Sequence, residues 1–191
     1  MIIVKSALKN YARRPQLREV IRRQAAKLAF KVGILFSLGI PENRLLPPKL
    51  LKEVAQFDDI LLASYTDTCH NLTLKTISNL RFVHRHCLHT SPSFVFFDDD
   101  HGINLKKLRQ FFSNVSLVEV RRSVFGFFNY NKRVIRDAEH KWFTSVSDYP
   151  FHIIIIIPWV IAISSAPILY KSSLSLLPLR ASCPMRTYMW A

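Results

Sequence analysis

The chain has 191 residues, 49% of them hydrophobic and 21% charged, which excludes an intrinsically disordered protein and suffices for one domain with a sizeable core. Lysine and arginine outnumber aspartate and glutamate by 27 to 13, which gives a net charge of +14. This balance predicts an anionic partner: a nucleic acid, a membrane surface or a phosphorylated ligand.

Helical and strand patterns alternate along the first part of the chain. The run "MIIV" at residues 1–4 is too short for the core of a signal peptide, so we expect none. A basic helix follows, and strand patterns occupy residues 30–39 and 60–63, with a short helix at 49–57 between them. The apolar face of the basic helix is predicted to consist of Leu17, Val20, Ile21 and Leu28.

The same alternation continues beyond residue 70. We expect a helix at 72–86, a third strand at 94–97 and another helix at 105–112. The inward side chains of the helix at 72–86 are predicted to be Leu72, Ile77, Leu80 and Val83. The order α-β-α-β-α-β-α predicts an α/β fold, an open and largely parallel sheet with helices on both faces.

The densest negative charge of this basic chain follows directly after its most strand-like run. Asp98, Asp99 and Asp100 come after the apolar residues 94–97. In open α/β sheets, ligands bind beyond the carboxyl ends of the strands, where carboxylates can hold Mg²⁺ or Mn²⁺. Such an ion can bridge the phosphates of a nucleotide. The triplet by itself fits equally well a solvated acidic turn that caps the helix near Asn104.

Several motifs around the triplet occur in a fixed order. They are "YTDTCHNLTLKT" at 65–76, "FVFFDDDHGIN" at 94–104 and "KWFTSVSDYPF" at 141–151, preceded by "RRPQLREVIRRQ" at 13–24. Together they resemble glycosyltransferase family 31, the β-1,3-galactosyltransferase and β-1,3-N-acetylglucosaminyltransferase group. The resemblance runs from about residue 11 to 151, with 152–191 diverged, within a single domain of residues 1–191.

The resemblance implies a GT-A-like fold and an inverting β-1,3 transfer of galactose or N-acetylglucosamine from a UDP-sugar to a glycan hydroxyl on a glycoprotein or glycolipid. It also implies Mn²⁺ and a membrane-associated enzyme in the Golgi lumen, although no anchor is visible in this chain. Asp100 is expected to be the direct Mn²⁺ ligand and Asp98 a second metal residue near the ribose. The donor-site residues that it implies are Arg22, Asp67, Lys75, Asp98, Asp99 and Trp142. For Lys75 a solvated helix face, and for Trp142 a structural role, remain equally open.

Departures from the family pattern lie at the carboxyl-terminal end. No aspartate or glutamate follows Asp148, and all four glycines lie at or before Gly126. An inverting transfer needs a general base, normally a carboxylate, so the catalytic base is not found and we expect weak or no transfer. Asp137 and Glu139 are, with Asp148, the remaining substitutes near Trp142. The sequence leaves open a truncated or inactive family member, incomplete at its carboxyl-terminal end.

Residues 151–169 are long and uncharged enough for a membrane span. Two prolines and five consecutive isoleucines instead favour a strand buried in the sheet, which we expect.

Two further interpretations concern charged clusters. The run "HRHCLH" at 84–89 suggests a zinc site or, alternatively, the carboxyl end of a helix, where His and Arg complement the dipole. The basic residues of the first helix suggest phosphate contacts of a nucleic-acid-binding or membrane-binding module. No nucleic-acid motif accompanies them, so we do not expect a nucleic-acid partner.

Overall fold

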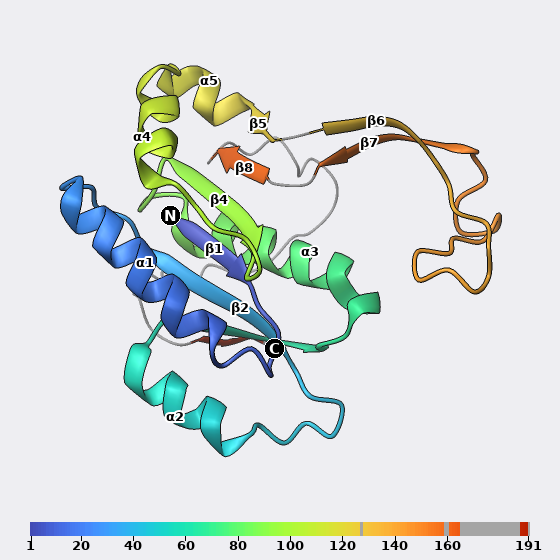
Figure 1. Cartoon of the computed structure of the whole chain (residues 1–191), viewed down its shortest axis with the longest axis horizontal. Coiled ribbons are helices and arrows are strands. Elements are labelled where there is room, and N and C mark those ends of the chain that lie inside the picture. The colour runs from blue at the N-terminus through green and yellow to red at the C-terminus, as the bar shows by residue number, and fades with distance from the viewer. Residues whose placement is uncertain (127, 159–160, 165–187, 191) are drawn as a thin grey trace.

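The computed structural model of the chain describes residues 1–126, 128–158, 161–164 and 188–190 (Figure 1). Its centre is a seven-stranded sheet with the order β5-β8-β4-β1-β2-β3-β9. The strands on which the site depends are mutually parallel. They are β1 (Ile2–Lys5), β2 (Ile34–Ile40), β3 (Ile60–Thr66) and β4 (Ser93–Asp98).

Short strands extend the sheet on both sides. β9 (Tyr188–Trp190) lies parallel to β3. On the other side β8 (Ile161–Ser164) pairs antiparallel with β4, and β5 (Val124–Phe125) pairs antiparallel with β8. The sheet is therefore open and largely parallel, as the sequence predicts.

Helices cover both faces of this sheet, which confirms the predicted α/β class (Figure 1). α1 (Arg13–Lys27), α2 (Pro48–Phe57) and α4 (Leu105–Ser113) pack on one face. α3 (Leu72–Phe82) and the π-helical turn η2 (Val83–Cys87) pack on the other. A single 3-10 turn, η1 (Cys69–Asn71), leads into α3, and α5 (Leu117–Arg122) follows α4.

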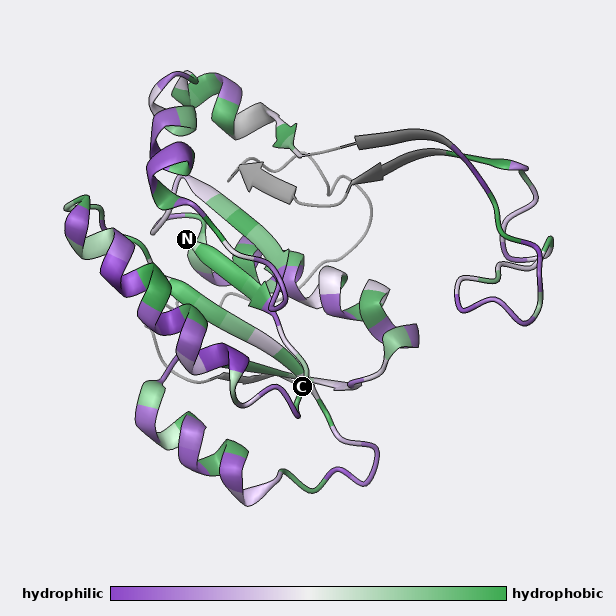
Figure 2. Ribbon diagram, in the orientation of Figure 1, coloured by the Kyte–Doolittle hydropathy of each residue, from purple (hydrophilic) through white to green (hydrophobic). Residues whose placement is uncertain are grey.

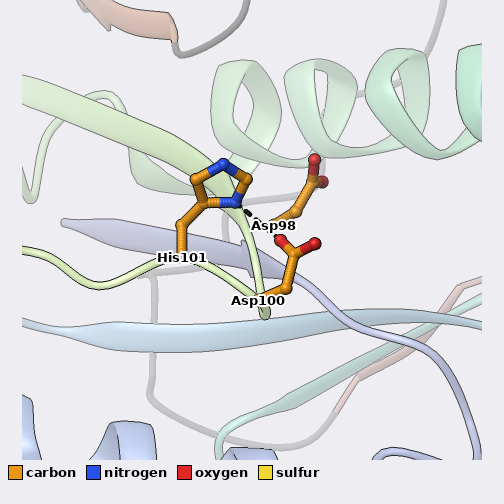
Figure 3. A group of neighbouring side chains, drawn as sticks. All are labelled: Asp98, Asp100 and His101. Atoms are coloured by element: carbon orange, nitrogen blue, oxygen red, sulfur yellow. Dashed lines mark hydrogen bonds and ion pairs between the residues drawn. The ribbon is translucent and has the colours of Figure 1, made fainter.

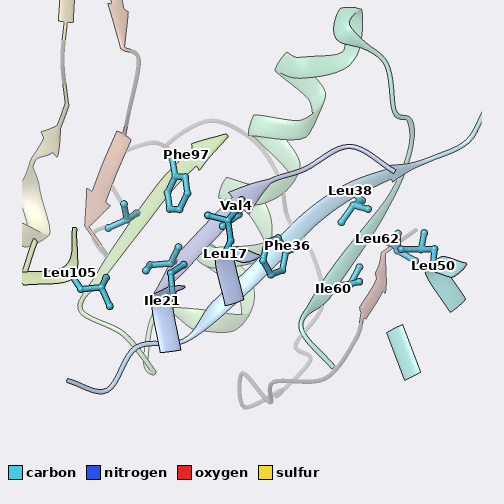
Figure 4. Packing of buried hydrophobic residues seen from close by; sticks show 12 residues of the cluster. Val4, Leu17, Ile21, Phe36, Leu38, Leu50, Ile60, Leu62, Phe97 and Leu105 are labelled. Carbon is cyan, nitrogen blue, oxygen red and sulfur yellow. The ribbon is translucent and has the colours of Figure 1, made fainter. Parts of the chain in front are cut away.

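The two cores correspond to the two faces of the parallel strands. On the face of α1, Val4 and Phe36 contact Leu17 and Ile21 (Figure 4). On the face of α3, Ile3 of the same central strand packs with Phe82. Figure 2 shows the same division, with apolar strands inside and polar outer surfaces on α1 and α4. Because both faces are covered, these strands are apolar almost throughout rather than alternating.

The sequence patterns missed several strands, among them β1, and they assigned exposed residues to the buried faces of two helices. β1 was not expected, yet it is the central strand between β2 and β4. Val20 is 44% exposed on α1, because the buried stripe of that helix also contains arginines. On α3, Leu72 and Ile77 are more than a third exposed. The side chains that α3 buries instead are Lys75, Asn79 and Phe82.

Beyond α5 the chain forms a separate antiparallel ribbon. β6 (Phe128–Arg133) pairs with β7 (Ile153–Pro158), and the loop between them extends away from the main sheet (Figure 1). Arg136 organises this loop by donating hydrogen bonds to the carbonyl oxygens of Thr144, Ser145, Tyr149 and Phe151, at 2.6–2.8 Å.

The isoleucine-rich segment therefore contains strands, as predicted. The expectation of a strand buried in the main sheet is wrong for β7, which pairs only with β6 and begins with Ile153 44% exposed. Residues 159–160 and 165–169 of the predicted segment lie outside the described residues. No helix in the described ranges combines the length and apolar character that a membrane crossing requires.

Candidate functional site

The carboxyl ends of the parallel strands bring the motif residues to one edge of the sheet. β1 ends at Lys5, β3 at Thr66 and β4 at Asp98. Lys5 and Asp98 are opposite each other in the pairing of β1 with β4. Asp67, which directly follows β3, lies at the same edge. Three segments that are separate in the sequence thus meet where α/β sheets bind ligands.

The first aspartate of the triplet lies at the surface and is paired with a cation. Its Oδ1 is 3.1 Å from Nζ of Lys5, and its side chain is 47% exposed. Its carbonyl oxygen accepts a hydrogen bond of 3.1 Å from the amide of His101, which closes a tight turn after β4. Asp98 therefore presents a half-neutralised carboxylate to solvent.

Asp100 and His101 complete the outer side of this turn (Figure 3). Nδ1 of His101 lies 2.6 Å from Oδ1 of Asp100, and both side chains are about half exposed. Ligand atoms from Asp98, Asp100 and His101 all lie within 4.8 Å of one another. Among the described residues this is the group of at least three His, Cys, Asp or Glu side chains that is close enough to share one metal ion.

The middle aspartate points inward instead. Asp99 is 9% exposed, and its carboxylate accepts hydrogen bonds from Ser6 Oγ at 2.6 Å and from Asn10 Nδ2 at 2.8 Å. Nη1 of Arg13 lies 3.1 Å from its Oδ1. Its amide also donates to the carbonyl of Lys5. These contacts anchor the turn after β4 to the segment between β1 and α1.

The second interpretation of the acidic triplet, as a turn that caps the next helix, is wrong, because a different residue caps α4. The amino-terminal cap of α4 is Asn104, whose Oδ1 accepts a hydrogen bond of 3.0 Å from the amide of Lys107. The three aspartates precede this cap and do not serve as it.

Asp67 and Lys75 form a buried ion pair beside the turn. Lys75 Nζ lies 2.6 Å from Oδ1 of Asp67 and donates to the carbonyl of Ser6 at 2.8 Å. Both side chains are 5% exposed, so the solvated helix face that was one alternative for Lys75 is wrong. Asn71 of the same motif donates to the carbonyl of Thr66 at 2.8 Å. The motif thus holds the start of α3 against the ends of β1 and β3.

Arg22 lies away from these groups. It is exposed and lines a small pocket with Ile34 and Asp59, which mark the opposite, amino-terminal ends of β2 and β3. A larger pocket of about 470 Å³ also lies at that end, lined in part by Gly33 and Ile34, and not at the triplet of residues 98–100. The structure does not bring Arg22 together with the turn at 98–100.

The arginines that α1 buries are Arg14 and Arg18, which sequence reasoning assigned only to a basic surface. Arg14 Nη2 lies 2.6 Å from Glu53, and Arg18 forms two hydrogen bonds of 2.7 Å with Asp59. Arg18 also contacts Glu53 at 2.8 Å. Their spacing supplied a signal, because positions 14 and 18 share one helix face with 17 and 21.

This network has a defined charge state. Burial raises the pKa of Glu53, but the hydrogen bonds from Arg14 and Arg18 lower it more, so it lies below the ordinary value of 4.5. Burial lowers the pKa of Arg18, and its contacts with Asp59 and Glu53 more than compensate. With both arginines engaged in this way, two of the basic side chains of α1 face its interior partners and not an external phosphate.

Trp142 and the nearby carboxylates lie on the ribbon loop. The indole is 54% exposed, with Lys141 Nζ 4.9 Å from its ring centre. Asp148 accepts a hydrogen bond of 2.6 Å from Ser145.

The "HRHCLH" run at 84–89 was the candidate zinc site. Within the described ranges it does not bring three potential metal ligands close enough to share an ion. Burial together with the charge of Arg85 lowers the pKa of His86.

Comparison with known proteins identifies the family of this chain. Residues 12–161 match the family described as galactosyltransferase. The chain belongs to this family. The resemblance to glycosyltransferase family 31 is thereby confirmed, and the matched range includes the turn at 98–101 and the ion pair of Asp67 with Lys75.

Individual relatives agree with this membership. The chain is 28% identical over 152 residues to beta-1,3-galactosyltransferase 5 of Homo sapiens, which covers 79% of this chain and 48% of that protein. It is 26% identical over 155 residues to lactosylceramide 1,3-N-acetyl-beta-D-glucosaminyltransferase of Rattus norvegicus, covering 78% of this chain and 41% of that protein. The chain thus spans about half the length, or less, of the curated relatives it matches.

Proposed function

We propose that the turn after β4 holds a divalent cation, Mn²⁺ in the first place, and that this ion binds the diphosphate of a UDP-sugar. The observation that carries the proposal is the group of ligand atoms from Asp98, Asp100 and His101 within 4.8 Å at the carboxyl edge of the sheet. Carboxylate oxygens suit Mn²⁺ and Mg²⁺, and bound ions of this kind neutralise transferring phosphate groups.

The residues present fit such an ion. Asp100 is the better primary ligand, because the charge of Asp98 is already shared with Lys5 at 3.1 Å. Lys5 in turn is a cation beside the ion and supports the binding of a diphosphate. Asp99 contributes by holding the turn, and the pair of Asp67 with Lys75 by holding the neighbouring helix.

On this basis the protein is a hexosyltransferase that moves galactose or N-acetylglucosamine from UDP to a glycan hydroxyl, inverting, in a β-1,3 linkage. Membership of the galactosyltransferase family and the activities named for the relatives support this assignment. The same proposal includes location in the Golgi lumen in association with the membrane. It also includes roles of Arg22 and Trp142 in donor binding, and organisation as a single domain. Because no carboxylate follows Asp148, we expect slow transfer from this chain even when the donor binds.

Calorimetry of UDP binding with and without Mn²⁺ tests the site. Asp100→Asn removes one charge while keeping the size of the side chain, and Glu42→Gln is the matched control, since Glu42 is exposed and lies after β2. We expect Mn²⁺ to strengthen UDP binding in the wild type and in Glu42→Gln but not in Asp100→Asn. Equal enhancement in all three proteins would reject the metal site.

Transfer itself needs a separate assay. Radiolabelled UDP-galactose and UDP-N-acetylglucosamine are offered with acceptors that end in galactose or N-acetylgalactosamine. We expect turnover near background, because general-base catalysis contributes about 10²–10⁴-fold and its usual carboxylate is absent. Rapid transfer would show that Asp137, Glu139, Asp148 or another group serves as the base.

A further inference from the structure

The turn after β4 offers a nitrogen as well as oxygens to a cation. The hydrogen bond from the amide of His101 to the carbonyl of Asp98 folds the chain so that the imidazole lies on the side of the two carboxylates (Figure 3). Nδ1 of His101 is 2.6 Å from Oδ1 of Asp100. The imidazole thus already faces the oxygen that is expected to bind the ion.

These distances suit a single ion. Ligand atoms that are about 2.1 Å from a small divalent cation lie about 3.0 Å apart when adjacent and about 4.2 Å apart when opposite. The three ligand atoms of Asp98, Asp100 and His101 lie within 4.8 Å of one another, and Asp100 and His101 are half exposed and free to adjust. In the bound state two bonds to the cation replace the present contact between Nδ1 and Oδ1.

The charges around the turn make a third donor useful. Asp99, the middle acid, is directed inward by Ser6 and Asn10 and contributes no oxygen to the outer surface. Asp98 is partly neutralised by Lys5. Two carboxylates and one lysine leave a net charge near −1 to hold a divalent ion, so a neutral imidazole strengthens binding without adding charge.

Resting on the proposed function, we infer that His101 is a third protein ligand of the ion held by Asp98 and Asp100. A site of two carboxylates and one imidazole differs in selectivity from one of carboxylates alone. Imidazole favours Co²⁺ and Zn²⁺ and accepts Mn²⁺, whereas Mg²⁺ prefers oxygen and retains its waters. His101 therefore biases this chain towards transition-metal ions over Mg²⁺.

Titration with Co²⁺ alone, followed by visible absorption, tests the ligand directly, because the spectrum reports nitrogen coordination. His101→Ala is compared with His89→Ala, the matched control, since His89 is also exposed and lies in the turn before β4. We expect His101→Ala to weaken Co²⁺ binding at least about tenfold and to change the spectrum, since loss of a group that supports a metal site typically costs 10–100-fold. The affinity for Mg²⁺ should be nearly unchanged, so Mg²⁺ should displace Co²⁺ more easily from His101→Ala than from the wild type.

A second measurement uses Mn²⁺ at substoichiometric amounts. Its unpaired electrons broaden the nuclear magnetic resonance signals of nearby protons, so the ring signals of His101 should broaden before those of His89. Addition of UDP should sharpen this difference by increasing occupancy. Thermal unfolding of each variant confirms that it is folded.

The outcomes separate this inference from the function on which it rests. Weaker Co²⁺ binding in Asp100→Asn and in His101→Ala, with a changed spectrum in His101→Ala, supports both. Loss in Asp100→Asn with unchanged affinity and spectrum in His101→Ala overturns the role of His101 and keeps the metal site. Retention of all metal effects in Asp100→Asn overturns the site itself.

Discussion

Replacing Arg18 by methionine removes a cation from a place that water does not reach. The guanidinium is 2% exposed, forms two hydrogen bonds of 2.7 Å with Asp59, lies 2.8 Å from Glu53 and is 4.1 Å from the ring centre of Phe57. Methionine preserves most of the apolar stem. The variant therefore isolates the loss of charge: Asp59 stays buried without the Arg18 guanidinium, while Glu53 keeps its contact with Arg14.

The expected loss is large. Removing one partner of a buried ion pair costs about 3–5 kcal/mol, because the remaining charge is left without compensation. For a chain of this size a loss of 1 kcal/mol lowers the melting temperature by about 2–4 °C, so a decrease on the order of 10 °C is expected.

Urea unfolding followed by circular dichroism at pH 7 measures the free energy of unfolding. Arg22→Met is the matched control, since it makes the same substitution one turn further along α1 at an exposed position. Its effect should stay within about 0.5 kcal/mol. Arg18→Met combined with Asp59→Asn should recover part of the loss, because the orphaned carboxylate is then neutral.

One result would refute the reasoning. If Arg18→Met were no less stable than Arg22→Met, the buried network would not contribute as its geometry indicates. The same pair of variants also informs donor binding: weaker UDP binding in Arg22→Met at unchanged stability would support the role in the donor pocket that the family resemblance implies for Arg22.

Three further changes have defined outcomes. Gly39→Ala would place a methyl group 2.6 Å from the backbone oxygen of Tyr65 and should lower the thermal midpoint by the equivalent of about 1–3 kcal/mol. The control Gly102→Ala meets nothing within 4 Å and should leave the midpoint unchanged, so equal midpoints would contradict the close approach at Gly39. Lys75→Met should cost about 3–5 kcal/mol in urea unfolding, because Asp67 loses its buried partner; a loss of UDP affinity at unchanged stability would instead indicate a diphosphate contact. Because the pKa of Glu53 is lowered on folding, its contribution to the free energy of unfolding should be complete well above pH 4.5 and be lost as the pH falls through the folded-state pKa. Glu53→Gln should remove that part of the acid dependence of the urea midpoint, and a pH profile identical to that of the wild type would argue against this role.

The sequence alone determined the class of the fold and the location of the candidate site. Alternating patterns of apolar residues predicted β2, β3, β4 and the helices between them, because periodicity is a local property of the chain. The acidic triplet directly after β4 predicted a candidate metal site at the carboxyl edge. The motifs from residue 65 to 151 indicated the family, since several short patterns in one order identify a family where a single triplet would not.

Only the tertiary structure decided which side chains of those motifs face the outside. Asp99 turns inward because Ser6, Asn10 and Arg13, more than 80 residues earlier, supply its hydrogen bonds. Arg18 is buried because Asp59, 41 residues further along the chain, accepts its hydrogen bonds, whereas Arg22 one turn later is exposed. Charged side chains are exposed by default and are buried only with a partner, so their burial depends on partners that the fold brings to them.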